Sequence, residues 1–337
     1  MGWLERLART LLGEGGAHPL ERDAGVRTPA PIQAAADVPI VPVQRKVLAI
    51  VHDPIVRERQ NRRLRSLLGW NDPDALVAAY SNDLRAASGG YADFQIAERI
   101  EVDDFPLKQD GYRYDEASFL KAWGRRKFHE PDAVDYLALV REFDLIGRVD
   151  RGEIDEVWLL GFPYCGYYES IMAGPGAFWC NAPPLAGTEG ASRRFIIMGF
   201  NYERGVGEML EDFGHRAESI LSHVFRHTHG DANLFERFTR YDRLHPGRAE
   251  VGNVHFAPNS ERDYDWGNRR YVLSRCDTWH AFPDLSGEAR KVNCDEWGGG
   301  DIRLHHLWWL EHLPRAPGSA NGIANHWWTY VVDPNLV

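Results

Sequence analysis

Hydrophobic residues recur along the chain with the two periods that distinguish strands from helices. Short apolar runs and two-residue alternation predict buried strands at 46–51, 91–102, 157–161 and 194–200. Apolar residues spaced three and four positions apart predict amphipathic helices at 72–88, 132–146 and 206–225. Strands that alternate with helices indicate an α/β fold with a mostly parallel open sheet, flavodoxin-like or Rossmann-like, covered by helices on both faces.

The sequence predicts three parts. Residues 1–44 are rich in Gly, Ala and Pro and are typical of an N-terminal arm or linker. Residues 45–250 carry the predicted α/β domain. Residues 251–337 consist of short apolar pieces broken by Asn, Asp, Gly and Pro, and hold seven of the twelve tryptophans. We expect them to form an irregular, tryptophan-rich lobe packed on the sheet.

Composition and charge exclude several classes of function. No apolar run reaches the roughly 18 residues of a membrane-spanning helix. The net charge of −10 argues against a nucleic-acid partner, because phosphate requires a cationic face. Glu5 and Arg9 interrupt the stretch where a signal peptide would be apolar, so we expect a cytoplasmic protein, with an extracytoplasmic one left open.

Nucleotide-type cofactors are not expected. The first strand is followed by His52-Asp53-Pro54 instead of the glycine-rich turn that binds the pyrophosphate of NAD or FAD. No Walker loop is present either. In open α/β sheets, ligands bind beyond the carboxyl ends of the strands. That rule selects side chains after the first, third and fourth predicted strands, which are His52, Asp53, Cys165, Glu169, Asn201 and Tyr202.

The helix predicted at 206–225 carries a row of ionisable side chains. Glu211, His215 and Glu218 follow one another at intervals of four and three residues, so they lie along one side of the helix. A carboxylate, an imidazole and a second carboxylate in a row can bind a divalent cation or orient a histidine as a general base. The alternative is an ordinary solvated helix face.

A metal site on this helix needs ligands from elsewhere. The HxxE spacing of His215 and Glu218 lacks the second histidine of the HExxH and HxxEH zinc motifs. The candidates are His305 or His306, of which one could face the site because adjacent helical residues point about 100° apart, and His255.

The tryptophans allow two interpretations. Trp308, Trp309, Trp327 and Trp328 lie among polar residues, as in sites that hold sugar rings by stacking and hydrogen bonding. The same residues could form a compact core, and this second interpretation is favoured because aromatic side chains mostly serve to bury area.

The four cysteines form no CxxC pair, so they carry no zinc-ribbon signature. Their spacing allows disulfides Cys165–Cys180 and Cys276–Cys294 in an oxidising compartment, or four small buried residues. Cys165 also follows a predicted strand, where it could act as a nucleophile with a histidine base.

Together these features predict a metal-dependent hydrolase that acts on a peptide, ester or glycan substrate. The cation would be divalent, with zinc as the preferred candidate, and would be held by Glu211, His215 and His305 or His306. Glu218 would activate water, and the tryptophans with His52, Asp53, Asn201 and Tyr202 would bind substrate. Two alternatives stay open. One is a metal-free hydrolase, including a glycosidase, that uses Glu169, other carboxylates or Cys165. The other is a non-catalytic carbohydrate- or partner-binding protein. Substrate, metal identity and oligomeric state are not predicted.

Overall fold

The computed structural model describes residues 41–337. The predicted arm of residues 1–44 therefore lies outside the described residues except for its last four positions, of which Val43 and Gln44 already belong to the first strand. The predicted boundary near residue 250 stays a prediction. Among the helices of residues 41–337, none combines the length and the apolar composition that crossing a membrane requires.

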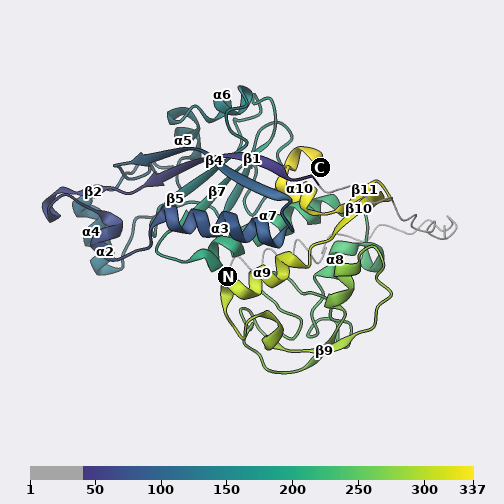
Figure 1. Cartoon of the computed structure of the whole chain (residues 1–337). Helices are drawn as coiled ribbons and strands as arrows, with labels where there is room; N and C mark the ends of the chain where they lie inside the picture. Colours follow the sequence, from purple (N-terminus) through teal and green to yellow (C-terminus); the bar gives the residue numbers. More distant parts are fainter. Residues whose placement is uncertain (1–40) are drawn as a thin grey trace, which may run out of the picture. The chain divides into compact units, whose positions relative to one another are not determined.

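A five-stranded, mostly parallel sheet forms the centre of the fold (Figure 1). Its order is β4-β1-β5-β7-β6. The bounds are β1 Val43–His52, β4 Ala92–Val102, β5 Glu156–Gly161, β6 Ser170–Ala173 and β7 Phe195–Asn201. The first four strands in this order are parallel, and β6 pairs antiparallel with β7 at the edge. All four predicted strands are confirmed, and the fold is a mixed α/β fold.

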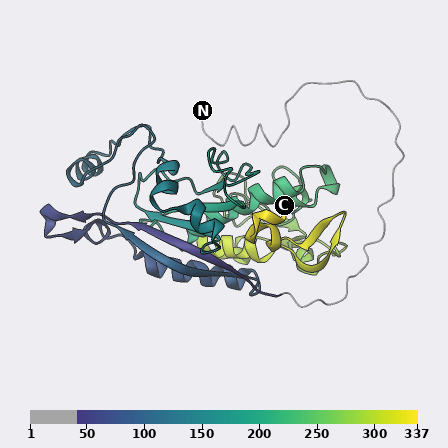
Figure 2. The same ribbon diagram turned by 90° about the horizontal axis from the view of Figure 1, so that it is seen from above.

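Helices cover both faces of the sheet, as Figures 1 and 2 show. In β1, Val47, Ala49 and Val51 point into one hydrophobic cluster, which also contains residues of α3 (Pro73–Ala87) and α7 (Val206–Val224). Leu48 and Ile50 point into the other cluster, with α5 (Tyr136–Glu142) and α6 (Leu145–Asp150). A strand buried on both faces reads as a continuous apolar run, which is why β1 was recognisable.

Helix α3 begins as predicted, with the Asp72 carboxylate accepting a hydrogen bond from Asp74 N at 2.9 Å. The single helix predicted at 132–146 is wrong. Asp135 caps the shorter α5, and Asp144 adopts a left-handed conformation with φ of 48°, which separates α5 from α6. Apolar spacing alone does not reveal such a break, because the apolar side chains of both pieces still face the same core.

Several short elements complete the chain. Before β5 lie β2 Ile55–Val56, η1 Arg57–Arg59, β3 Arg62–Arg63, α2 Leu64–Leu68 and α4 Glu116–Arg125. After α7 come η2 Gly230–Ala232, α8 Leu234–Phe238, β8 Val272–Ser274, η3 Cys276–Ala281, β9 Arg290–Val292, η4 Cys294–Trp297, α9 Ile302–Glu311, β10 Arg315–Ala320, β11 Ile323–His326, α10 Trp328–Val332 and η5 Pro334–Leu336.

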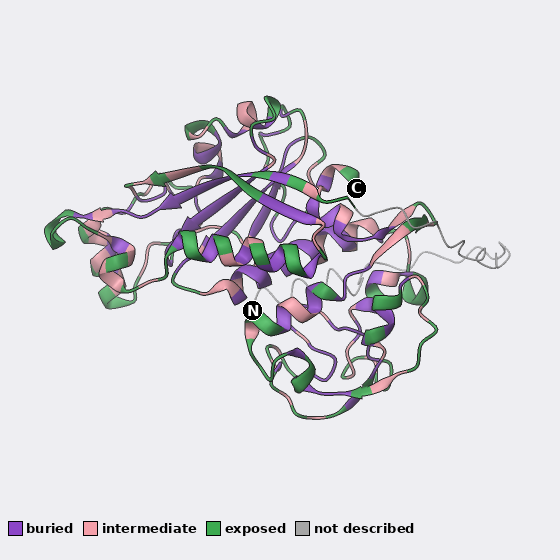
Figure 3. Cartoon of the chain, viewed as in Figure 1, coloured by how far each residue is buried: buried purple, intermediate pink, exposed green. Residues whose placement is uncertain are grey.

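The segment after residue 250 shares its core with the sheet. Helix α9 packs against α7 and α3, and one hydrophobic cluster runs from β1 and β5 into this segment. Large aromatic side chains fill it, and Figure 3 shows the buried positions extending across both regions. The indoles that are almost completely buried are Trp158, Trp279, Trp297, Trp309, Trp327 and Trp328. For these residues the core interpretation is confirmed.

A buried ion pair joins α7 to the sheet. The Arg216 guanidinium donates two hydrogen bonds of 3.0 Å to the two carboxylate oxygens of Glu156 in β5. It also donates to the carbonyl of Val331 in α10 at 2.9 Å, and Trp158 Nε1 donates to Glu156 at 2.7 Å. Both charged side chains are almost fully buried. This network fixes α7 against β5 and α10.

Removal of one charge of this pair is expected to destabilise the protein strongly. In Glu156→Gln, Arg216 stays buried without an anionic partner, which costs about 3–5 kcal/mol. Urea unfolding followed by tryptophan fluorescence measures the loss. Glu153→Gln, at the exposed pair with Arg151, is the control and should leave the unfolding midpoint near that of the wild type. Equal midpoints for both variants would contradict a structural role for the pair.

Candidate metal centre

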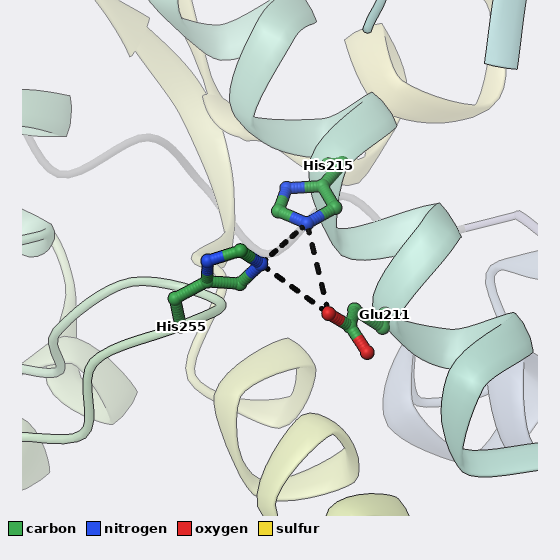
Figure 4. A group of neighbouring side chains, drawn as sticks. All are labelled: Glu211, His215 and His255. Carbon is green, nitrogen blue, oxygen red and sulfur yellow. Dashed lines mark hydrogen bonds and ion pairs between the residues drawn. The ribbon is translucent and has the colours of Figure 1, made fainter. Parts of the chain in front are cut away.

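Three side chains from two segments converge beside α7 (Figure 4). Glu211 and His215 lie one turn apart in the helix, and His255 comes from the loop between α8 and β8. His215 Nε2 is 3.0 Å from His255 Nε2, and Glu211 Oε1 is 3.3 Å from His255 Nε2 and 4.0 Å from His215 Nε2. We call these three residues the triangle. All three side chains are almost wholly buried.

The size of the triangle matches the coordination sphere of zinc. Ligand atoms bonded to zinc at 2.0–2.1 Å in a tetrahedral arrangement are about 3.3 Å apart. The three measured separations, 3.0, 3.3 and 4.0 Å, lie around that value. Two imidazoles and one carboxylate are also ligands that zinc accepts, and three protein ligands leave a fourth position for water or substrate.

A carboxylate lies beside the Nδ1 atom of each imidazole. Glu218 Oε2 is 3.0 Å from His215 Nδ1, while its Oε1 accepts a hydrogen bond from Val254 N at 3.0 Å. Asp263 Oδ1 is 3.0 Å from His255 Nδ1, as an ion-pair contact and not a well-aligned hydrogen bond. A carboxylate on the Nδ1 side turns Nε2 toward the centre of the triangle, which is the usual arrangement of histidines that bind metals.

The third ligand is oriented as well. The Tyr264 hydroxyl donates a hydrogen bond to Glu211 Oε1 at 3.0 Å, and it lies 3.2 Å from His255 Nε2. Its ring stays half exposed, so it lies between the triangle and solvent. The triangle is thus buried on the helix side and bordered by a hydroxyl on the outer side.

Close packing of the loop against α7 buries this polar face. A Cβ at Gly214 would lie 2.6 Å from Val254 Cγ2, so only glycine lets the loop that carries His255 approach the helix. The alternative interpretation of Glu211 and His215 as part of a solvated helix face is therefore wrong. Ionisable groups that are removed from water must be paired or must bind a cation.

Electrostatics in the triangle favour positive charge. Burial lowers the pKa of His215, but Glu218, Glu169 and Glu211 outweigh it and raise this pKa to about 9. Burial acts to raise the pKa of Glu218, but its bond and charge interaction with His215 bring that pKa below its usual value. An imidazolium therefore balances the carboxylates when no metal is bound, and a divalent cation would take over that role by displacing its proton.

The structure brings Glu211 and His215 together with His255, the third candidate, and not with His305 or His306. His306 Nε2 lies 3.3 Å from the carbonyl of Val254, and His305 stacks on Trp266 with ring centroids 4.8 Å apart. Both are buried in α9, and burial lowers the pKa of His306 to about 4. Direct ligation by His305 or His306 remains a prediction that this geometry does not support.

Burial and Glu211 raise the pKa of Tyr264, and, against the lowering by burial, Glu218 raises the pKa of His215; the charge of Glu169 adds a smaller effect of the same sign to both pKa values. Glu169 precedes β6 and is half-buried. Its Oε2 accepts a hydrogen bond from Asn181 Nδ2. The backbone N–H of Asn181 in turn donates a hydrogen bond to Ser219 Oγ in α7. Glu169 thus borders the site with one carboxylate oxygen engaged.

The segments that follow the carboxyl ends of β1, β5 and β7 meet, as expected from the strand positions. Tyr167 OH lies 2.7 Å from His52 Nδ1, and Tyr202 OH donates to the carbonyl of His52 at 2.9 Å. The Asp53 carboxylate is buried and pairs with Arg65 at 2.8 Å. Asn201 Oδ1 accepts a hydrogen bond from Glu203 N at 2.9 Å. These groups bond to protein partners, and their role in substrate binding stays a prediction.

Cys165 is a buried thiol beside the same segments. Burial raises its pKa to about 12, so the thiol is protonated at neutral pH. This state is the opposite of what a nucleophile needs. All four cysteines lie within the described residues and are free, so neither Cys165–Cys180 nor Cys276–Cys294 forms a disulfide in the structure.

The four tryptophans predicted to line a substrate cleft lie mainly in the core. Trp309, Trp327 and Trp328 have no exposed surface. Trp308 is half-buried between Trp297 and His312, with ring centroids 5.2 and 4.3 Å away. A sugar ring would need an exposed indole face, so the arrangement gives no support to a stacking platform built from these residues.

Models of known protein families give no match to the chain, and a comparison with curated proteins gives none either. The function is therefore argued from the site itself.

The buried His52 makes acid pH destabilising. Burial lowers its pKa to about 4 from 6.5. Protonation therefore favours the unfolded chain. The contribution of His52 to the unfolding free energy is constant above pH 6.5 and falls as the pH drops towards 4. In His52→Asn the loss of unfolding free energy between pH 7 and 4 should be smaller than in the wild type by up to about 3 kcal/mol. Urea titrations at several pH values measure it. The exposed His227→Asn is the control, and an unchanged loss in His52→Asn would refute the assignment.

Proposed function

We propose that the protein is a metal-dependent hydrolase whose divalent cation is held by Glu211, His215 and His255. The observation that carries this proposal is the triangle itself, in which two imidazoles turn Nε2 toward a shared point while carboxylates face their Nδ1 atoms. Zinc is the cation that best fits two nitrogens and one oxygen at these separations.

A divalent cation in such a site polarises a carbonyl or phosphoryl oxygen and lowers the pKa of water. Glu218 would orient His215, since it lies on the Nδ1 side of that ring, whereas Nε2 faces His255. We therefore move the role of general base from Glu218 to Glu169, which keeps one oxygen free and lies near His215 and Tyr264. The Tyr264 hydroxyl would donate a hydrogen bond to a substrate oxygen. The substrate is a peptide, an ester or a glycan.

We also propose that the sheet is of the flavodoxin-like type. If the four parallel strands β1, β4, β5 and β7 are numbered 1 to 4 along the chain, their order across the sheet is 2-1-3-4, and the antiparallel β6 lies at the edge. This is the beginning of the flavodoxin-like order. In this proposal the triangle lies on a covering helix and not at the point where the strand order reverses, which is beside β1.

The proposed metal site predicts near-stoichiometric zinc, manganese or iron at the triangle. His215→Ala and His255→Ala should each lose that cation, because two remaining ligands bind weakly. Elemental mass spectrometry of untagged protein purified without chelator measures the content, with circular dichroism to check the fold. The exposed His227→Ala is the matched control and should keep the metal.

Two results would contradict this proposal. Unchanged metal content in both folded variants would place any cation elsewhere. A wild-type protein that takes up no divalent cation at the triangle after reconstitution would leave the metal-free hydrolase and the non-catalytic binding protein as the remaining functions.

Glu169 is expected to act in the reaction and not in metal binding. Glu169→Gln should keep the cation but lower hydrolysis by about 10²–10⁴-fold in a screen of peptide, ester and glycan substrates. Glu218→Gln is the matched comparison, and it should weaken metal affinity by about 10–100-fold because it loosens His215. If Glu169→Gln retained full activity, the assignment of the base would be wrong.

A further inference from the structure

A second group of ligand-type side chains lies away from the triangle in sequence. Cys276 and Asp277 begin η3, and His312 caps the carboxyl end of α9. One ligand atom of each lies within 4.8 Å of the others, and Cys276 Sγ is 3.6 Å from Asp277 Oδ1. Thiol, carboxylate and imidazole are three different metal-binding groups brought together from segments more than thirty residues apart.

Each of these groups is held by a neighbour. His312 Nδ1 is 2.6 Å from the carbonyl of Trp308, which leaves Nε2 as the nitrogen available to a ligand. Both oxygens of Asp277 accept hydrogen bonds from Arg290, at 2.5 and 2.9 Å. Cys276 N donates to the hydroxyl of Ser274 at 3.0 Å. The orientation is therefore set before any ligand binds.

The cluster is accessible from one side. Cys276 and His312 are buried, but more than half of the Asp277 side chain is exposed. Next to it, an open pocket of about 250 Å³ is lined by His280 and by Glu311 and Leu313, the two neighbours of His312 in sequence. The His280 ring lies 4.2 Å from the His312 ring. A cation could enter from this pocket and find a fourth ligand there.

The end of α9 adds to the attraction for positive charge. His312 lies where the last carbonyls of the helix carry the negative end of its dipole. Arg290 balances the charge of Asp277 but is shared with Glu296, to which it is bonded at 2.7 Å. Glu311 and Arg315 line the adjacent pocket, so three carboxylates, those of Asp277, Glu296 and Glu311, face the two arginines Arg290 and Arg315 around the cluster.

We propose that Cys276, Asp277 and His312 bind a thiophilic divalent cation such as zinc, with His280 or water as the fourth ligand. Sulfur, nitrogen and oxygen donors together select zinc over calcium or magnesium. The cation would join η3 to the end of α9, the helix that packs against α7. This proposal does not rest on the proposed hydrolase, because the Cys276 cluster and the triangle share no residue.

Cobalt(II) distinguishes this site from the triangle. Bound to a thiolate, it gives an intense near-ultraviolet sulfur-to-metal charge-transfer band, which nitrogen and oxygen ligands do not give. The full-length protein is stripped of metal under reducing conditions and titrated with Co²⁺. We expect the band to grow until one equivalent of Co²⁺ is bound at this site. The band should persist in His215→Ala, whatever becomes of the triangle.

Cys276→Ser should abolish the band, whereas Cys294→Ser, at another buried thiol of the same region, should keep it. Absence of the band in the wild type, or its survival in Cys276→Ser, would overturn the proposal. If Cys276→Ser does not fold, His312→Gln retains the thiol and should weaken Co²⁺ affinity at least about tenfold. Unchanged affinity in that variant would overturn the proposal equally.

Discussion

The ion pair between Arg216 and Glu156 determines how α7 is rotated about its own axis. Adjacent residues of a helix point about 100° apart. Because Arg216 is fixed into the sheet by two bonds to Glu156 and by the carbonyl of Val331, its neighbour His215 must point sideways, toward the segment that follows residue 250. The same constraint directs Glu211, one turn earlier. A charge buried in the core of the sheet thus determines which face of the helix carries the site.

The site itself follows from the cost of burying polar groups. The loop around Val254 packs against Gly214 and removes Glu211 and His215 from water. Such burial is tolerated because the loop brings its own polar partners, His255, Asp263 and Tyr264. The carboxylates together leave the centre short of positive charge. An imidazolium supplies this charge in the absence of metal, and a divalent cation would supply more of it in the same volume.

Both candidate cation sites use α7 or the helix packed on it. The triangle lies on α7, and the Cys276 cluster lies at the end of α9, which covers the same region. Helix α9 packs against α7 and ends at His312, so the helix that contacts the one carrying Glu211 and His215 also positions a member of the Cys276 cluster.

Local patterning was sufficient to predict the secondary structure that builds the sheet. The strands β1, β4, β5 and β7 and the helices α3 and α7 are recognisable because the spacing of their apolar residues reflects packing against the two hydrophobic clusters of the sheet. The alignment of Glu211 with His215 is equally local, since four residues make about one helical turn. The break at Asp144 was not predicted, because a residue in the left-handed conformation does not change the spacing of the apolar residues around it. Only the tertiary structure decided that His255, and not His305 or His306, completes the triangle. It also decided that Asp263 and Tyr264 support it, and that most of the tryptophans are core. The contacts of His255 with His215 and of Tyr264 with Glu211 join residues 40 and 53 positions apart, and the sequence carries no periodic signal for contacts made by an irregular loop.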